Sequence, residues 1–244
     1  MLIFYGLEVL VMKTIRSAFG YFSKLELALW GTSAAMILLA FFAFDRERYL
    51  TLAASLIGAT SLIFNAKGNP MGPLLMIVFS LLYGVVSFTC AYYGEMITYM
   101  GMTAPMALFA LIAWTRNPYN GNKAEVAVAQ VGRRETAAML AAALAVTVAF
   151  FFILRAFHTA NLLPSTISVT TSFLAVYLTF RRSPYHALAY AANDVILIAL
   201  WALATREDSS YVSVLVCFVM FFFNDLYGFV NWSRMRRRQQ RALA

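Results

Sequence analysis

Two carboxylate side chains stand inside runs of apolar residues that are long enough to cross a lipid bilayer. Asp194 follows Asn193 in the run AYAANDVILIALW. Asp225 follows Asn224 in the run FFNDLYGFVNW. An Asp at the centre of a membrane costs about 2.5–3.5 kcal/mol on insertion scales, so such residues face a bundle interior or a wet cavity and mark ligand sites or pathways. The two Asn-Asp pairs therefore predict a polar site at membrane depth.

Helical spacing adds aromatic rings to these polar groups, because residues three, four and seven apart share one face of a helix. One face would hold His186, Tyr190, Asn193, Asp194 and, further along, Trp201; a second would hold Asn224, Tyr227 and Asn231, with Asp225 beside it. Amides, carboxylates and flat rings together suit a ligand that has a planar ring and several hydroxyl groups. A second interpretation stays open, in which the Asn and Asp side chains only join helices by hydrogen bonds.

Three of the rings have an alternative position at the membrane surface, where Trp and Tyr are enriched. Tyr227 and Trp232 lie near the end of the last apolar run, and the basic stretch RMRRR follows Trp232 closely. We therefore expect Trp232 at the surface. For Trp201 a surface position and a place in the site fit equally well.

The composition predicts a membrane protein. Of the 244 residues, 62% are hydrophobic and 12% are charged, and the mean hydropathy is +0.72, whereas soluble domains carry about 25% charged residues. The net charge of +8 does not indicate nucleic-acid binding, because the basic residues flank apolar runs, where lipid headgroups account for them. Cys90 and Cys217 lack metal-site spacing. No metal, cofactor or nucleotide motif and no nucleophile with a base is recognisable, so we expect neither an enzyme nor an ATP-driven pump.

Eight runs have the length of a spanning helix, which needs about 20 residues. They cover residues 27–44, 50–66, 73–92, 94–114, 136–157, 163–180, 185–204 and 210–232. Within residues 1–26, the shorter run MLIFYGLEVLVM predicts a helix at the membrane surface. The polar stretch NPYNGNKAEV (117–126) predicts a turn followed by the start of a helix. The acidic residues other than Asp194 and Asp225, Glu95 among them, are assigned to loops or tails.

The two halves of the chain share short features. Trp114–Arg116 matches Trp232–Arg234 near the ends of the fourth and eighth runs, and the third and seventh runs begin near Pro73 and Pro184. Parallel repeats with a substrate site at their interface are a known transporter plan. We predict an all-α membrane protein with an extra N-terminal helix before a 3+1+3 core. Its parts are residues 1–47 with the extra helix, 48–116 as the first three-helix repeat, 117–160 as loop and connector helix, 161–233 as the second repeat, and 234–244 as a basic tail.

Orientation follows from the Lys and Arg residues, which concentrate in the segments on one side of the predicted bundle. Cytoplasmic segments carry an excess of these residues. An even number of spans places both termini on the same side. We therefore expect both termini in the cytoplasm.

Three stretches, FRRSPYHALAYAANDVILIALW, FFNDLYGFVNWSRM and NPYNGNKAEV, closely resemble the PnuC family of bacterial vitamin transporters, over about residues 48–240. The resemblance implies a homotrimer in the inner membrane that takes up nicotinamide riboside by facilitated diffusion for NAD biosynthesis. Retention would come from phosphorylation by a cytoplasmic kinase. Family members are often described with tryptophans in the site, where this chain has Tyr190 and Phe223. Relatives carry thiamine, deoxynucleosides or riboflavin, and these substrates stay open.

The expected ligand is a cationic pyridinium on a ribose, for which an aromatic face adds about 0.5–2 kcal/mol of cation–π attraction. The substrate-binding residues that we predict are Asn193 and Asn224 for hydrogen bonds, Asp194 and Asp225 for polar or charge complement, and Tyr190, Tyr227 and Trp201 for ring packing. A membrane-embedded enzyme would need a nucleophile or a metal cluster at one membrane face. A structural membrane protein, in which the Asn-Asp pairs only pack helices, is the remaining alternative.

Overall fold

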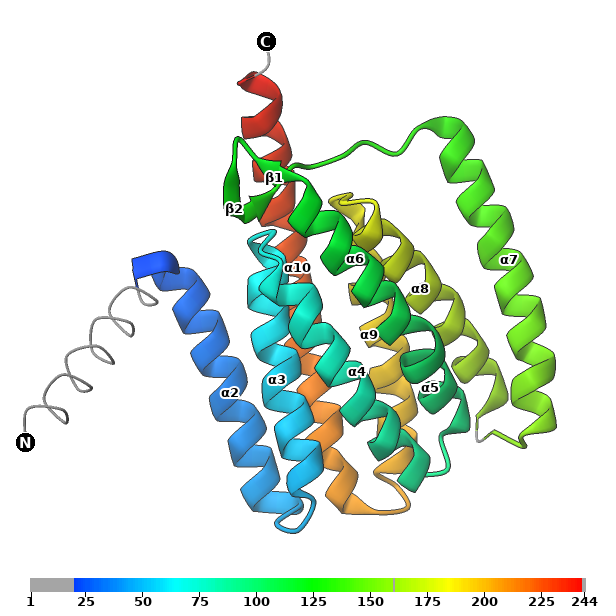
Figure 1. Ribbon diagram of the computed structural model, residues 1–244. Coiled ribbons are helices and arrows are strands. Elements are labelled where there is room, and N and C mark those ends of the chain that lie inside the picture. The colour runs from blue at the N-terminus through cyan, green and yellow to red at the C-terminus, as the bar shows by residue number, and fades with distance from the viewer. Residues whose placement is uncertain (1–19, 160, 243–244) are drawn as a thin grey trace, which may run out of the picture.

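The computed structural model describes residues 20–159 and 161–242 as a bundle of long helices that run side by side (Figure 1). Eight of the helices in these ranges are long and apolar enough to cross a membrane, which confirms the predicted fold class and the predicted spans. The predicted surface helix within residues 1–26 lies for the most part outside the described residues. The helices are α2 (Lys24–Phe44), α3 (Tyr49–Ala66), α4 (Met71–Thr89), α5 (Tyr93–Thr98), the π-helical turn η1 (Tyr99–Thr103), α6 (Ala104–Arg116), α7 (Arg133–Ala156), α8 (Leu162–Phe180), α9 (Tyr185–Ala204), the short η2 (Ser209–Tyr211) and α10 (Val212–Arg241).

The stretch NPYNGNKAEV forms a hairpin and not the start of a helix, so this part of the prediction is wrong. Strands β1 (Pro118–Tyr119) and β2 (Asn122–Val126) pair in antiparallel fashion. Asn120 and Gly121 between them have φ of 48° and 78°, which is the geometry that two-residue hairpin turns require and that Asn-Gly favours. The next helix begins only at Arg133.

The last helix continues beyond its predicted end at residue 232, to Arg241. Arginine and glutamine are good helix formers, so the basic stretch extends the helix out of the apolar span. The extension contacts the hairpin, because Arg238 pairs with Glu125 and the Gln239 side chain accepts a hydrogen bond from the Val128 N–H at 2.8 Å. The hairpin thus sits on the end of α10 (Figure 1).

The helices form two triplets with similar patterns of contacts. In the first triplet α3 packs on α4 and α4 packs on α5, η1 and α6; in the second α8 packs on α9 and α9 packs on α10. Between the triplets, the first helix of each packs on the last helix of the other, so α3 contacts α10 and α8 contacts α6. Helix α7 packs on α8, and α2 packs on α3 and α10.

Two tryptophans bind the triplets together in a reciprocal way. The Trp114 indole N–H of α6 donates to the Thr179 carbonyl at 2.9 Å, and the Trp232 indole N–H of α10 donates to the Asn65 carbonyl at 2.7 Å. Thr179 and Asn65 are the penultimate residues of α8 and α3, where the last carbonyls of a helix lack partners within it. The two indole rings lie 5.3 Å apart.

The turns that lead into α4 and α9 are also alike. Each has a residue at positive φ, Gly68 at 66° and Arg182 at 55°, and a proline at the N-cap, Pro70 and Pro184. Pro70 is therefore the counterpart of Pro184, and the pairing of Pro73 with Pro184 made from the sequence is wrong. The proline suits this place because its missing N–H would have no helical partner there.

Two helical glycines provide a matched test of the packing between α3 and α10. A Cβ on Gly58 would overlap the rings of Phe221 and Phe79, whereas a Cβ on Gly31 of α2 would meet nothing within 4 Å. We expect Gly58→Ala to lower the free energy of unfolding by about 1–3 kcal/mol, because overpacking forces neighbouring side chains to move. Gly31→Ala should leave it unchanged or raise it by up to about 1 kcal/mol. Denaturant unfolding in detergent micelles measures both, and equal stability of the two variants would contradict the packing described.

Candidate functional site

Asn193 lies at the centre of a buried polar cluster. Its side chain is 1% exposed, and its Oδ1 accepts hydrogen bonds from the hydroxyls of Ser168, Thr171 and Ser172 of α8 at 3.2, 2.8 and 3.1 Å. Its Nδ2 donates to the Tyr99 hydroxyl of η1 at 3.4 Å. A carbonyl oxygen has two lone pairs, so it cannot hold all three hydroxyls at once. The Thr171 hydroxyl can donate instead to the Ser168 carbonyl of its own helix at 3.0 Å, so it can leave Asn193 without losing a partner.

Asp194 and Asp225 meet each other across the contact of α9 and α10. Both are buried, and each carboxyl group acts electrostatically on the other. Asp194 Oδ2 is buried without a further partner among the described residues. The structure thus brings the two predicted acids together into one acid pair.

Tyr190 lies where the two triplets meet. It lines a cavity of about 10 Å³ together with residues of both triplets, namely Asn65, Pro73, Met76, Met106, Ala107, Ala110, Val176 and Thr179. A space of this size holds about one water molecule. The conformation is therefore closed around Tyr190, and the triplets would have to move apart there to admit an organic ligand.

Trp201 belongs to the core. It is fully buried, and its indole N–H donates to the Tyr83 hydroxyl of α4 at 2.8 Å. The Tyr83 ring packs against Tyr99 at 4.5 Å and Phe218 at 5.3 Å between ring centroids. This settles the question that the sequence left open, in favour of an interior place for Trp201.

Trp232 is buried as well, so the expectation that it lies at the membrane surface is wrong. Its ring packs against Trp114 and, at 4.7 Å between centroids, against His186, whose Nδ1 lies 2.8 Å from the Ser183 carbonyl. The basic residues after Trp232 misled the prediction because α10 carries them beyond the apolar span.

These rings form two aromatic layers across the junction of the triplets. The first layer holds Trp114, His186 and Trp232, and the second holds Tyr83, Trp201 and Phe218. Along α9, Asp194 comes two turns after His186 and two turns before Trp201. The acid pair therefore lies between the layers, which close the bundle toward both of its ends.

On the second predicted helix face, Asn224 and Tyr227 contact α2, whereas the Asn231 amide donates to the Ala66 carbonyl of α3 at 2.8 Å. Asn224 Nδ2 donates to the Ser33 hydroxyl at 2.8 Å, and the Tyr227 hydroxyl donates to Glu26 Oε1 at 3.0 Å. Glu26 also pairs with Lys67 at 3.1 Å. Asn224 and Tyr227 are thus apart from the cluster around Asn193, and their role in a site stays a prediction.

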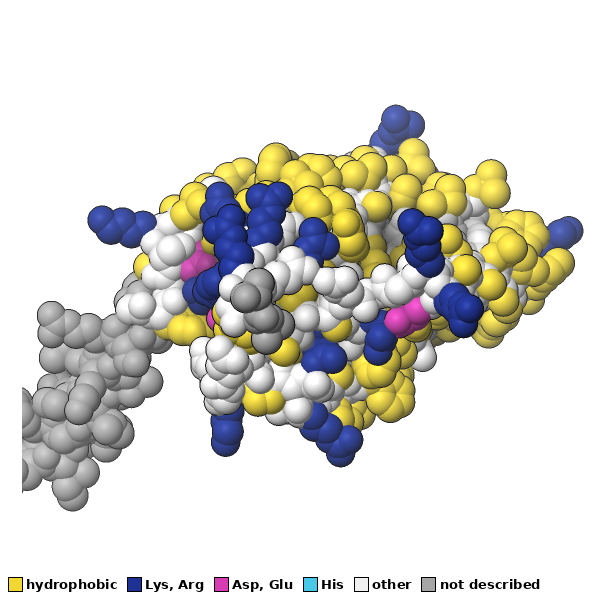
Figure 2. Space-filling view, turned by 90° about the horizontal axis from the view of Figure 1, so that it is seen from above, with side chains coloured by type: hydrophobic (Ala, Val, Ile, Leu, Met, Phe, Trp, Pro, Cys, Tyr) yellow, Lys and Arg dark blue, Asp and Glu magenta, His cyan; other side chains and the backbone are white. Residues whose placement is uncertain are grey.

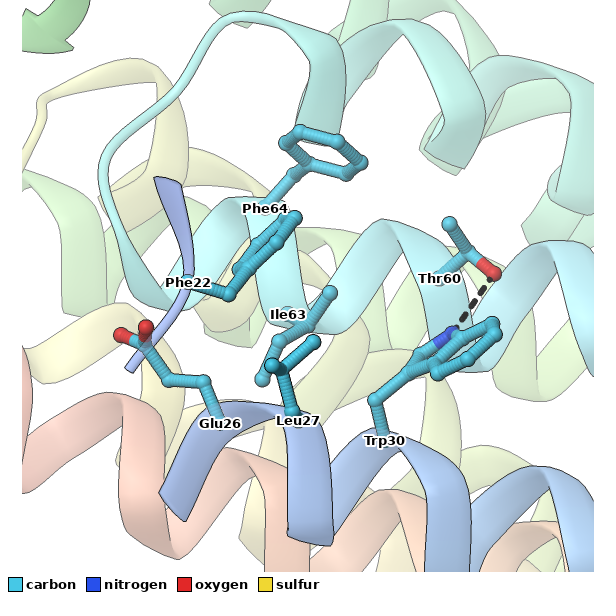
Figure 3. A pocket seen from close by; sticks show the side chains of 7 residues that line it. All are labelled: Phe22, Glu26, Leu27, Trp30, Thr60, Ile63 and Phe64. Carbon is cyan, nitrogen blue, oxygen red and sulfur yellow. Dashed lines mark hydrogen bonds between the residues drawn. The ribbon is translucent and has the colours of Figure 1, made fainter. Parts of the chain in front are cut away.

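A larger pocket lies at the outer seam between α2 and α3. Figure 3 shows its lining, which is apolar except for Glu26 and Thr60, with the Trp30 indole N–H bonded to Thr60 Oγ1 at 3.1 Å. Its volume is about 180 Å³. None of the predicted site residues lines it, so it is a seam between helices and not the chemical centre of the bundle.

Glu95 is the buried acid that the sequence analysis missed. It lies in α5, is 1% exposed and faces Ser168 of α8, yet neither carboxylate oxygen has a well-formed hydrogen bond among the described residues. The prediction that it lies in a loop is wrong. It falls in the first turn of its span, and no neighbouring amide marks it as the asparagines mark Asp194 and Asp225.

The helix that carries Glu95 is irregular at the level of the Asn193 cluster. The π-helical turn η1 follows α5 directly and contains Tyr99. Pro105 lies one residue into α6 and cannot donate to the carbonyl four residues before it, which loosens the helix at this turn. Such π turns are frequent at functional sites because they redirect side chains.

The contact between Asn224 and Ser33 can be tested by a double-mutant cycle. We expect Asn224→Ala and Ser33→Ala each to lower stability, and the pair to show a coupling energy of about 0.6–1.7 kcal/mol, the range of hydrogen bonds between membrane helices. Unfolding in detergent measures it. Additive effects would show that Asn224 is not tied to α2 in solution.

Comparison with known proteins gives concordant results. Residues 48–234 match the family described as nicotinamide mononucleotide transporter. A nicotinamide riboside transporter PnuC from Neisseria mucosa is 25% identical over 229 residues, which are 91% of this chain and 86% of that protein. The crystal structure of the vitamin B3 transporter PnuC superimposes with a TM-score of 0.78 at 22% identity, over 89% of this chain and 94% of the other, and shows the same fold.

Proposed function

Because the chain belongs to the nicotinamide mononucleotide transporter family, we propose that it carries nicotinamide riboside across the bacterial inner membrane. The observation that carries this proposal is the buried set of Asn193, the acid pair and Glu95 between two aromatic layers of a membrane bundle. These groups match a ligand with hydroxyls, a carboxamide and a cationic ring.

The charges in the bundle favour the riboside over the mononucleotide. Glu95, Asp194 and Asp225 are buried, whereas no Lys or Arg among the described residues is buried to the same degree. A phosphate group would add about 1.5–2 negative charges to this acidic interior with no cation to receive them. The pyridinium of the riboside brings the opposite charge and offsets the cost of an ionised carboxylate.

The roles that we assign follow from the contacts. Asn193 and the hydroxyls of α8 would bind the ribose or the carboxamide, and the three acids would complement the ring charge. Tyr190 and Trp201 would supply ring faces. Asn224 and Tyr227 would join the site only if α2 moved, because both are bonded to it.

Transport requires the two layers to open in turn. Each layer joins the triplets, through the reciprocal tryptophan bonds at one end and the bond from Trp201 to Tyr83 at the other. Opening one layer while the other holds exposes the acid pair to one side, which is alternating access. Such a carrier needs no energy source of its own, and phosphorylation of the riboside by a cytoplasmic kinase would retain it in the cell for NAD synthesis.

The orientation and the assembly are part of the proposal. Figure 2, seen onto the end where α10 finishes, shows many Lys and Arg side chains. By the positive-inside rule this end faces the cytoplasm, and we assign both termini to the same side of the membrane. We keep the division into residues 1–47, 48–116, 117–160, 161–233 and 234–244, for which the packing of α3 on α4 and of α8 on α9 is the support, and the family resemblance suggests a homotrimer.

Titration of nicotinamide riboside into the purified protein tests the site. We expect Asn193→Ala and Glu95→Gln each to weaken binding by about tenfold or more, because a buried hydrogen bond to a polar or charged ligand group contributes about 1–3 kcal/mol. Thr60→Ala, in the outer seam between α2 and α3, is the matched control and should bind normally. Unchanged affinity in both site variants would remove the proposed site, and a parent protein that binds no riboside would favour a purely structural role.

Uptake into proteoliposomes tests substrate and mechanism. We expect the riboside to enter until concentrations equalise, with no dependence on an imposed pH gradient, and to accumulate only when a riboside kinase and ATP are enclosed. The mononucleotide should enter at least about tenfold more slowly, and competition with thiamine, a deoxynucleoside and riboflavin ranks the alternatives. Accumulation without the kinase, or equal uptake of the mononucleotide, would contradict the proposal.

A further inference from the structure

A groove of about 720 Å³ opens at the end of the bundle where α8 finishes and where α7 and α9 begin. Its walls come from the linker after the hairpin, the first turns of α7, the turn between α8 and α9, and the extension of α10. All these segments lie at ends of apolar spans. The groove is therefore at the depth where lipid headgroups surround the protein.

The polar part of the groove is positively charged. Arg236 and Arg237 line it, with the Arg236 guanidinium 5.7 Å from the centre of the Tyr185 ring, and no acidic residue is among the lining residues. Neither arginine forms an ion pair within the described residues, whereas their neighbour Arg238 pairs with Glu125. The groove thus offers two unpaired guanidinium groups to an anion.

A second acidic residue near the groove also already has partners. Glu135, in the first turn of α7, pairs with Arg181 at the end of α8 and accepts a hydrogen bond from the Tyr177 hydroxyl at 3.0 Å. Burial, together with the neighbouring Arg181, lowers the pKa of Arg182. Positive charge therefore accumulates at this turn without an acid left to neutralise Arg236 and Arg237.

The floor of the groove is apolar. Met139 and Leu178 line it below the arginines. Helix α7 stands at the edge of the bundle and packs on α8 (Figure 1). The seam beside it continues from headgroup depth along the apolar spans. A ligand with an anionic head and a long apolar tail matches both parts.

We propose that this groove binds the phosphate headgroup of an anionic membrane phospholipid, which Arg236 and Arg237 hold. Basic pockets between membrane helices at headgroup depth are known to bind such headgroups, and guanidinium groups suit phosphate because they donate two hydrogen bonds in parallel. The site is independent of the transport pathway and does not rest on the proposed substrate.

The test uses the purified full chain in detergent, with phosphatidylglycerol and phosphatidylcholine of equal chain length. Native mass spectrometry counts retained lipids, and thermal unfolding measures the stabilisation. We expect phosphatidylglycerol to bind and to raise the melting temperature, whereas phosphatidylcholine does neither. The double variant Arg236→Gln/Arg237→Gln should bind phosphatidylglycerol about 30-fold more weakly, given the typical contribution of each basic residue near an anionic surface.

The matched control removes the same charge from the same end of the bundle. Arg116→Gln/Lys123→Gln changes two exposed cations of α6 and β2 that lie outside the groove, and it should retain lipid binding. Equal melting temperatures of both double variants in phosphatidylcholine establish that they fold. The proposal is overturned if both variants lose binding equally, if the two lipids bind alike, or if inorganic phosphate displaces phosphatidylglycerol at equal concentration.

Discussion

A polar side chain inside a bundle that lipid surrounds must find its partner within the bundle, because the hydrocarbon around it offers none. Asn193 meets this constraint through hydroxyls of α8 and η1, and Glu26 meets it through Lys67 and Tyr227. Each of these bonds also fixes the rotation of a helix. Glu95 and Asp194 Oδ2 do not meet it, since they are buried without a well-formed bond among the described residues, and under the proposed function a bound ligand would supply the missing partner.

The bonds between the triplets explain how a closed bundle can still conduct. Hydrogen bonds between membrane helices average about 0.6 kcal/mol in double-mutant cycles, so the tryptophan bonds of one layer do not lock the triplets. The rings exclude water and ions while the layer is closed. Under the proposed function, the interaction of a ligand with the acid pair and with Asn193 would offset the loss of one layer. The layers can therefore close the bundle to water although the hydrogen bonds that join them are weak.

The eight spans could be predicted because hydropathy and span length depend on local composition alone. The burial of Asp194 and Asp225 followed from the same reasoning, but their pairing depends on how α9 and α10 rotate against each other, which no local pattern shows. Asn224 and Asn193 are each followed by an Asp, yet the amide of Asn224 bonds to α2 and that of Asn193 bonds to η1. The hydrogen-bond partner of each amide is determined by how the helices pack and not by the residues beside it in the sequence.

The N-terminal helix shows how packing redistributes such roles. The match to the family begins at residue 48, after the end of α2, yet Ser33 and Glu26 of α2 supply the partners of Asn224 and Tyr227 on α10. Without α2 the Tyr227 hydroxyl would lose this partner and Asn224 would keep only its bond to the Met220 carbonyl of α10, at the cost that makes intramembrane polar groups rare. Helix α2 is therefore an integral part of this bundle, because it packs on the polar face of α10 that the other helices do not cover.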